Sequence, residues 1–229
     1  MIAALIVAAG KGVRMGTGLR KQYLSLGGQT ILAHTLKKFD QCPMVDHIVM
    51  AVPQDEMAFC RREIIDPLRM RAHTELVAGG ARRQDSVCNG LDVLTEEGIV
   101  LIHDGVRPLV SRNLIEACIQ GAQRWDACIP VLGVTDTLKK INPQGHIEAT
   151  VPREGLCMAQ TPQAFRATLI KQVHQTARRN GWTATDDASL VERAGGVVHV
   201  ISGSPINIKI TTPDDLRWAE TLLGSQFDL

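Results

Sequence analysis

Short apolar runs alternate with segments of helical periodicity along most of the chain. The apolar runs end at glycine, proline or charged residues and lie at 2–8, 47–52, 75–78, 99–103, 127–132 and 197–201. The intervening segments repeat apolar residues every three or four positions and lie at 29–41, 55–70, 83–95, 111–124, 167–179 and 185–194. Because buried strands that alternate with helices need cover on both faces of a sheet, we expect an α/β fold with a doubly wound, mostly parallel sheet.

Capping residues and one misplaced charge refine this pattern. Ser111 and Thr185 stand where helices are expected to begin, and Thr212 precedes a proline and two acids at the start of a last helix. Lys209 interrupts an otherwise apolar, strand-like stretch at 206–210. A lysine in an apolar strand is costly unless it is paired or lies at a site, so Lys209 is a candidate site residue.

The alternation breaks at 134–152. Two extended segments, 134–141 and 146–151, flank a turn that reads Asn-Pro-Gln-Gly, with proline at its second position and glycine at its fourth. This spacing predicts a protruding β-hairpin arm. A two-stranded hairpin is only marginally stable in water, so it must pack either on a second subunit or on its own domain.

Composition narrows the possible functions. The 229 residues suit a single domain, 1–229, and 45% apolar residues provide a sizeable core. A net charge of +1 and an aromatic content of 3% offer neither a broad basic surface nor stacking platforms, so no nucleic-acid partner is expected. No apolar run is long enough to cross a bilayer, so no membrane partner is expected either.

The six cysteines show neither metal-binding nor redox spacing. No C-x-x-C pair occurs, and four cysteines lie within apolar runs. We therefore expect small buried side chains in a reducing, cytoplasmic location. The apolar start of the chain lacks the basic segment and the length of a signal peptide, and it is expected to form the first strand.

The segment 8–16, directly after the first strand, combines small residues with cations. Its glycines, Gly10, Gly12 and Gly16, follow Ala8 and Ala9 and let backbone N–H groups approach a phosphate closely. Arg14 and the nearby Lys21 add positive charge, which suits a triphosphate. The segment is not a Walker motif, and its glycine spacing is a poor dinucleotide fingerprint. A tight turn with surface cations remains the alternative at this point.

A second cluster follows the predicted strand 75–78, at a strand end where open α/β sheets bind ligands. It contains Gly80, Arg83 and Ser86. The Gly80 backbone and the Ser86 hydroxyl can hydrogen-bond the edge of a base. An ordinary loop before a capped helix is the equally good alternative.

A third cluster lies at the end of the strand 99–103, where the apolar run gives way to charged residues, and it contains His103, Asp104, Gly105 and Arg107. A carboxylate at this position can hold a metal ion or order a cationic side chain, and the alternative is a capping Asp104 paired with Arg107. His103 is expected to be structural. Five further polar residues are scattered along the chain: Thr137, Arg153, Thr161, Thr185 and Asp186. Taken alone, each is most often a surface residue or a helix cap.

In this order, the motifs closely resemble the 2-C-methyl-D-erythritol 4-phosphate cytidylyltransferases of non-mevalonate isoprenoid biosynthesis. The matching motifs span essentially the whole chain and are A-A-G-x-G-x-R-M with K-Q-Y, G-G-x-x-R-x-x-S-V, H-D-x-x-R-P, D-T, P-R-x-x-L, Q-T-P-Q, T-D-D-A-S and N-I-K-I-T. The resemblance implies a Rossmann-like nucleotidyltransferase fold and a homodimer joined by the arm at 134–152. It also implies transfer of CMP from CTP to methylerythritol phosphate, with Mg²⁺ and release of pyrophosphate.

The resemblance also implies residue roles. The catalytic cations would be Arg14 and Lys21 on the CTP phosphates and Arg153 and Lys209 on the acceptor. The nucleotide would be surrounded by Ala8, Ala9, Gly10, Gly12, Gly80, Arg83, Ser86, Asp104 and Gly105. The acceptor would also contact Arg107, Thr137, Thr161 and Thr185, some of them across the dimer. Asp104 would order Lys209 or lie near Mg²⁺.

Elementary chemistry makes these roles sensible. The acceptor phosphate is already an anion, so its attack on the α-phosphorus of CTP needs no strong base. The reaction instead needs two anions brought together and transition-state charge stabilised, which fixed cations and Mg²⁺ provide.

Three rival functions remain open. Gly105-Val106 stands where the family usually has two alanines, a variant also found in ribitol 5-phosphate cytidylyltransferases, so ribitol 5-phosphate is an alternative acceptor. A non-catalytic nucleotide-binding module is an alternative of another class, although cations at 153 and 209 suggest a second anion site. A dinucleotide-dependent oxidoreductase is disfavoured by the glycine spacing and by the missing acid after the second strand.

Overall fold

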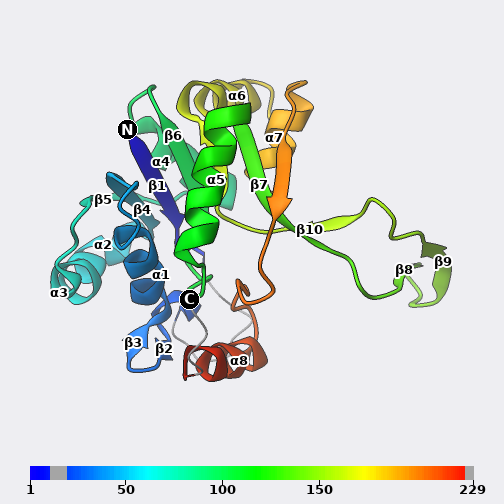
Figure 1. The fold of residues 1–229 in the computed structure, drawn as a ribbon, viewed down its shortest axis with the longest axis horizontal. Coiled ribbons are helices and arrows are strands. Elements are labelled where there is room, and N and C mark those ends of the chain that lie inside the picture. Colours follow the sequence, from blue (N-terminus) through cyan, green and yellow to red (C-terminus); the bar gives the residue numbers. More distant parts are fainter. Residues whose placement is uncertain (11–19, 225–229) are drawn as a thin grey trace.

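The computed structural model describes residues 1–10 and 20–224, and a twisted central sheet forms its middle layer (Figure 1). The strand order is β10-β7-β11-β6-β1-β4-β5, and β12 pairs with β7. The parallel part contains β1 (Ile2–Val7), β4 (His47–Val52), β5 (His73–Ala78) and β6 (Ile99–Asp104). A second parallel pair joins β7 (Ala127–Gly133) to β12 (His199–Ser202). The predicted mostly parallel α/β sheet is therefore confirmed.

Helices cover both faces of the sheet because the strands are apolar on both sides. Along β1, Ala4 and Ile6 face one layer, and Ala3 and Leu5 face the other. The first layer contains α1 (Ile31–Asp40), the short α2 (Met57–Phe59), the π-helical turn η4 (Cys60–Ile65), α3 (Asp66–Leu68) and α5 (Arg112–Trp125). The second contains α4 (Arg83–Asp92), α6 (Ala167–Arg179) and α7 (Asp187–Arg193).

A third, smaller cluster of buried residues closes the molecule below the carboxyl ends of the strands. It includes Leu26, Leu109 and Ile210. The elements around it are η2 (Lys21–Tyr23), the ribbon of β2 (Ser25–Leu26) and β3 (Gln29–Thr30), and α8 (Pro213–Gly224). Figure 1 shows β2, β3 and α8 together at this end of the molecule. The short helix η3 (Gln54–Glu56) follows β4 in the chain. This cluster positions the segment 206–211 against the strand ends.

The predicted arm is present and projects away from the sheet (Figure 1). It pairs β8 (Leu138–Ile141) with β9 (Ile147–Val151) in an antiparallel ribbon. The Asn142 carboxamide oxygen accepts hydrogen bonds from the backbone of Gln144 and His146, and Gly145 supplies the positive φ of 82° that the turn needs. Ile141 and Ile147 are each 64% exposed, so the arm leaves apolar surface uncovered in this chain.

Several sequence-based expectations were wrong in detail. Asp186, not Thr185, caps α7, because the Asp186 carboxylate accepts from the backbone N–H of Ser189. The segment 206–210 is not a strand, although Ile210 donates one backbone hydrogen bond to Val106. Five cysteines are buried as expected, but Cys157 is exposed on the strand β10 (Cys157–Ala159).

The sheet also contains antiparallel strands that the sequence pattern did not predict. They are β10 and β11 (Gln163–Arg166), and both pair with β7.

None of the helices in the described part of the chain combines the length and apolar character needed to span a bilayer.

Candidate nucleotide and acceptor site

A pocket of about 710 Å³ lies at the carboxyl edge of the parallel strands. Its described walls come from the segments after β1, β5 and β6, from η2 and from the segment before α8. This is the edge at which open α/β sheets bind ligands. Of the expected site residues, the pocket brings together Ala8, Ala9, Gly10, Lys21, Gly80, Arg83, Ser86, Asp104 and Lys209.

Small residues shape one wall of the pocket by close approach. A side chain at Gly79 would place its Cβ 2.1 Å from the Cβ of Ala9, and one at Gly80 would meet the Asp85 Cβ at 2.3 Å. Gly80 also donates its backbone N–H to the Ser86 hydroxyl at 3.0 Å. The loops after β1 and β5 therefore touch through glycine and alanine, which leaves a flat wall suited to a planar base.

Gln22 fixes the segment that follows the loop. Its buried side chain donates to the carbonyl of Ala8 at 2.7 Å and to that of Gly10 at 3.3 Å. The neighbouring Arg20 pairs with Glu56 at 2.8 Å, and Tyr23 donates to the same carboxylate. These bonds hold η2, and with it Lys21, against the end of β1.

The described pocket lining is strongly cationic. Asp104 is the only carboxylate among the described lining residues, whereas the cations are Arg20, Lys21, Arg82, Arg83 and Lys209. Some of these cations pair with acids outside the pocket, as Arg82 does with Asp85 at 2.7 Å. Cations gathered in a cleft favour an anionic ligand.

Asp104 is the centre of the charged cluster. Its carboxylate lies 2.8 Å from Lys209 Nζ, 3.2 Å from Arg83 Nε and 3.8 Å from Arg107 Nε. Burial alone would raise the pKa of Asp104, but Arg83 and Lys209 outweigh it and hold that pKa well below its usual range. Asp104 is therefore ionised, and its contact with Lys209 fits one of the two roles that the resemblance implied for it.

The cluster continues behind the pocket into the core. Arg83 Nη1 lies 2.7 Å from the Asp187 carboxylate, which also accepts from His174 Nε2 at 3.0 Å. Burial opposes the charged form of His174, but the hydrogen bond to Asp187 prevails and raises its pKa to about 9. His174, Asp187, Arg83, Asp104 and Lys209 thus form one chain of alternating charge that runs from the core to the pocket.

Neutral residues support this chain from below. His103 Nε2 faces the Arg107 carbonyl at 3.2 Å, so this nitrogen carries the proton and the Thr161 hydroxyl donates to Nδ1 at 3.0 Å. The Thr161 oxygen in turn accepts the backbone N–H of Asp104 at 3.1 Å. Burial lowers the pKa of His103 to about 3, so this ring is neutral. His103 is structural, as expected.

Other expected residues lie elsewhere. Thr161 is buried beneath Asp104, and Arg107 donates to the Asn207 carbonyl at 2.6 Å rather than lining the pocket. Gly105 packs against Ala8 and Leu32. Thr185 is exposed before α7, and Thr137 and Arg153 lie in the arm region, where Arg153 donates to the Thr135 carbonyl. Gly12 and Arg14 fall outside the described residues.

Sequence reasoning missed three residues that organise the site. Asp187 and His174 complete the charged chain, and Gln22 anchors η2. Gln22 and Asp187 stand inside quoted motifs, K-Q-Y and T-D-D-A-S, so the motif itself was the available signal. Nothing in the sequence singled out His174 as a site residue, because it is one of several polar residues on the predicted helix 167–179.

A doubly wound α/β sheet with a cationic, glycine-walled pocket at its carboxyl edge defines a nucleotide-binding protein of the α/β class. Comparison with known proteins narrows this class. The family model for 2-C-methyl-D-erythritol 4-phosphate cytidylyltransferase matches residues 2–225. The curated relative of that name from Syntrophotalea carbinolica is 49% identical over 99% of this chain and 98% of its own, and the one from Geotalea uraniireducens is 44% identical over 98% and 97%.

Solved structures agree with the sequence relatives. The 4-diphosphocytidyl-2C-methyl-D-erythritol synthase of Anaerococcus prevotii superposes with a TM-score of 0.85 and 31% identity over 98% of this chain and 96% of its own. The 2-C-methyl-D-erythritol 4-phosphate cytidylyltransferase of Thermus thermophilus gives 0.80 and 34% over 96% and 98%. The chain therefore belongs to the 2-C-methyl-D-erythritol 4-phosphate cytidylyltransferase family of nucleotidyltransferases.

Proposed function

We propose that this protein transfers CMP from CTP to 2-C-methyl-D-erythritol 4-phosphate and releases pyrophosphate. The observation that carries the proposal is the pocket, in which a flat glycine wall and Lys21 meet Lys209, held by Asp104 at 2.8 Å. One region suits a nucleoside triphosphate, and the other suits a second anion. Family membership supplies the identity of the two substrates.

The nucleotide would lie against the segments after β1 and β5. Ala8, Ala9 and Gly10 offer backbone groups beside Lys21, and Gly80 and Ser86 line the opposite side. The Ser86 hydroxyl already bonds Gly80 and Arg82 within the protein, so it both shapes the wall and retains one acceptor lone pair for a ligand. Arg14 is expected to add charge on the phosphates.

The acceptor phosphate would lie beside Lys209. Attack by this phosphate on the α-phosphorus forms one P–O bond as the bond to pyrophosphate breaks, and no proton needs to be removed. The protein's task is to hold two anions together and to stabilise the extra charge of the transition state. The paired, buried network behind Lys209 suits that task because its charges are fixed before substrates arrive.

Mg²⁺ is proposed as the metal cofactor, since Mg²⁺ is usually held by one or two carboxylates together with substrate phosphates and water. The described pocket fits this pattern with a single carboxylate, Asp104, whose two oxygens also face Arg83 and Lys209. Asp104 would therefore be one ligand of an ion that nucleotide phosphates hold for the most part. The ion would neutralise phosphate charge.

We propose a homodimer joined through the arm at 134–152. The arm and its neighbours expose Ile141, Ile147, Leu156 and Met158, each at least 42% accessible. Arg153 and Thr137, two of the implied acceptor contacts that lie outside the pocket, are in this same arm region, so a partner subunit would have to bring them to a pocket. A dimeric mass in light scattering, lost when Ile141 and Ile147 become aspartate, is the expected result.

We also propose a cytoplasmic location, which the six free cysteines support because exposed Cys157 would oxidise readily elsewhere. Family membership favours methylerythritol phosphate over ribitol 5-phosphate as the acceptor, and transfer over binding alone. Pyrophosphate release from CTP and Mg²⁺, measured with each acceptor in parallel, separates these functions. A strong preference for methylerythritol phosphate supports the proposal, preference for ribitol phosphate overturns the acceptor, and no release with either overturns the transferase.

A further inference from the structure

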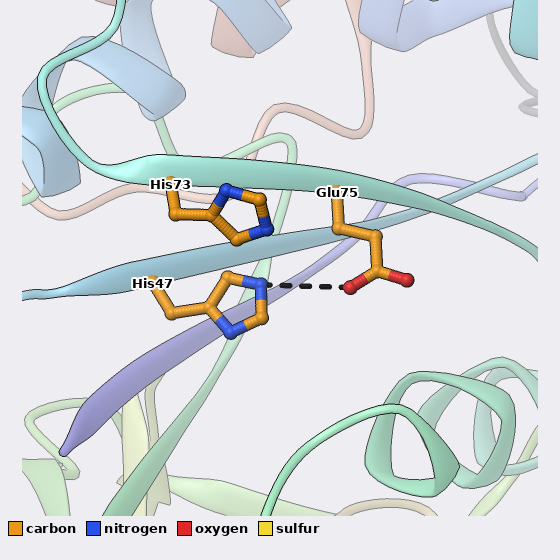
Figure 2. A group of neighbouring side chains, drawn as sticks. All are labelled: His47, His73 and Glu75. Atoms are coloured by element: carbon orange, nitrogen blue, oxygen red, sulfur yellow. Dashed lines mark ion pairs between the residues drawn. The ribbon is translucent and has the colours of Figure 1, made fainter.

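A cluster of three side chains of metal-binding type lies at the amino ends of β4 and β5, opposite the end of the strands that carries the pocket. His47 starts β4, and its register partner across the ladder is His73, which starts β5. Glu75 follows two positions along β5 and therefore faces the same side. Figure 2 shows the two imidazole rings and the carboxylate turned toward one another.

The geometry of the cluster is close to that of a metal site. One ligand atom from each residue lies within 4.8 Å of the others, and His47 Nε2 is 3.7 Å from Glu75 Oε2. Ligand atoms on a tetrahedral zinc ion at bonds of about 2.0–2.1 Å are about 3.3 Å apart. Because His73 is exposed and the Glu75 side chain is 40% accessible, small side-chain rotations close this gap.

One nitrogen of the cluster lacks the partner that its burial demands. His47 Nε2 is shielded from solvent and has no hydrogen-bond partner, and its distance to Glu75 is too long for a hydrogen bond. Buried polar atoms are rarely left unsatisfied, so an orphan nitrogen aimed at a carboxylate calls for an explanation. A cation between the two would satisfy both groups.

We propose that His47, His73 and Glu75 bind a zinc ion that ties the edge strand β5 to β4. Two imidazoles with one carboxylate form a donor set that zinc takes, whereas Mg²⁺ and Ca²⁺ prefer oxygen ligands alone. The site lies about 17 Å from the pocket, at the far end of a six-residue strand. Its role is therefore structural, and it is separate from the proposed magnesium.

The test is titration of the full-length, chelator-treated protein with zinc sulfate, followed by calorimetry and by thermal unfolding. We expect one zinc ion per chain with micromolar affinity and a Tm that rises with zinc concentration, because a ligand that binds only the folded state stabilises it. His73→Gln should weaken binding at least tenfold and abolish the Tm rise. Since the His73 side chain is exposed, the His73→Gln variant and the wild type should have the same Tm in the presence of chelator.

Two control variants separate this cluster from other zinc ligands. His146→Gln removes an exposed histidine in the arm, and Cys157→Ser removes the exposed thiol. Both should bind zinc as the wild type does. Equal affinity in His73→Gln, loss of binding in Cys157→Ser, or no saturable micromolar binding in the wild type would overturn the zinc site.

Discussion

The two ends of the parallel strands carry polar clusters that differ in how well their buried groups are paired. At the carboxyl edge, the Asp104 side chain is 10% accessible and lies within 4 Å of three cations. At the amino edge, the His47 side chain is 12% accessible, yet its Nε2 has no hydrogen-bond partner. The two groups are almost equally buried but differ in how fully they are satisfied.

This difference separates a preorganised site from an incomplete one. Burying a charge costs several kcal/mol, and the cost is recovered only when partners and hydrogen bonds are well placed. Behind Lys209 each acid and each cation of the network has an oppositely charged partner without a ligand, although Arg83 Nη2 has no hydrogen-bond partner. The lysine is therefore ordered before anions bind. The histidine pair at the amino edge meets this condition only when a cation arrives.

The largest effect on the carboxyl edge is expected from Lys21→Ala. Loss of one preorganised cation on the CTP phosphates should lower kcat by on the order of a hundredfold or more. Lys37→Ala is the matched control, because Lys37 lies on α1 and donates to Gln29 at the surface. Steady-state pyrophosphate release measures both variants, and an unchanged kcat in Lys21→Ala would remove that residue from the mechanism.

A smaller effect is expected from His174→Gln, at the buried end of the network. The folded pKa of about 9 lies above the ordinary 6.5, so the stabilisation is fully present below pH 6.5 and is lost as pH rises through 9. The wild-type free energy of unfolding should fall by on the order of 2 kcal/mol across this window.

The variant sharpens this prediction because it removes the titrating group. His174→Gln should be less stable than the wild type at pH 6.5 and should show a flatter pH profile up to pH 9. His199→Gln, at an exposed ring stacked on Trp125, should keep the wild-type slope. Urea unfolding across this pH range measures all three proteins, and parallel profiles for wild type and His174→Gln would contradict the assigned charge.

The sequence predicted the parallel strands and the helices well because their apolar periodicity is strong. It missed β11, whose four residues insert antiparallel between β6 and β7 and carry too short a pattern to be recognised. The segment 206–210 looked like a strand because it alternates, but it packs its isoleucines on the cluster above α8 without joining the sheet. Tertiary packing decided both outcomes.

The candidate site was predicted in part for a similar reason. Motifs after strand ends are local, so Gly80 and Asp104 were found. The contact between Arg83 and Asp187 joins positions 104 residues apart, and the sequence around neither residue predicts it. His47 and His73 meet only through the pairing of β4 with β5.

If the charged network holds Lys209 for the acceptor phosphate, the kinetics of Lys209→Ala with each substrate varied in turn should show it. We expect kcat/KM for methylerythritol phosphate to fall by on the order of a hundredfold while KM for CTP stays essentially unchanged. A comparable rise in KM for CTP, or an unchanged kcat/KM for the acceptor, would contradict this expectation.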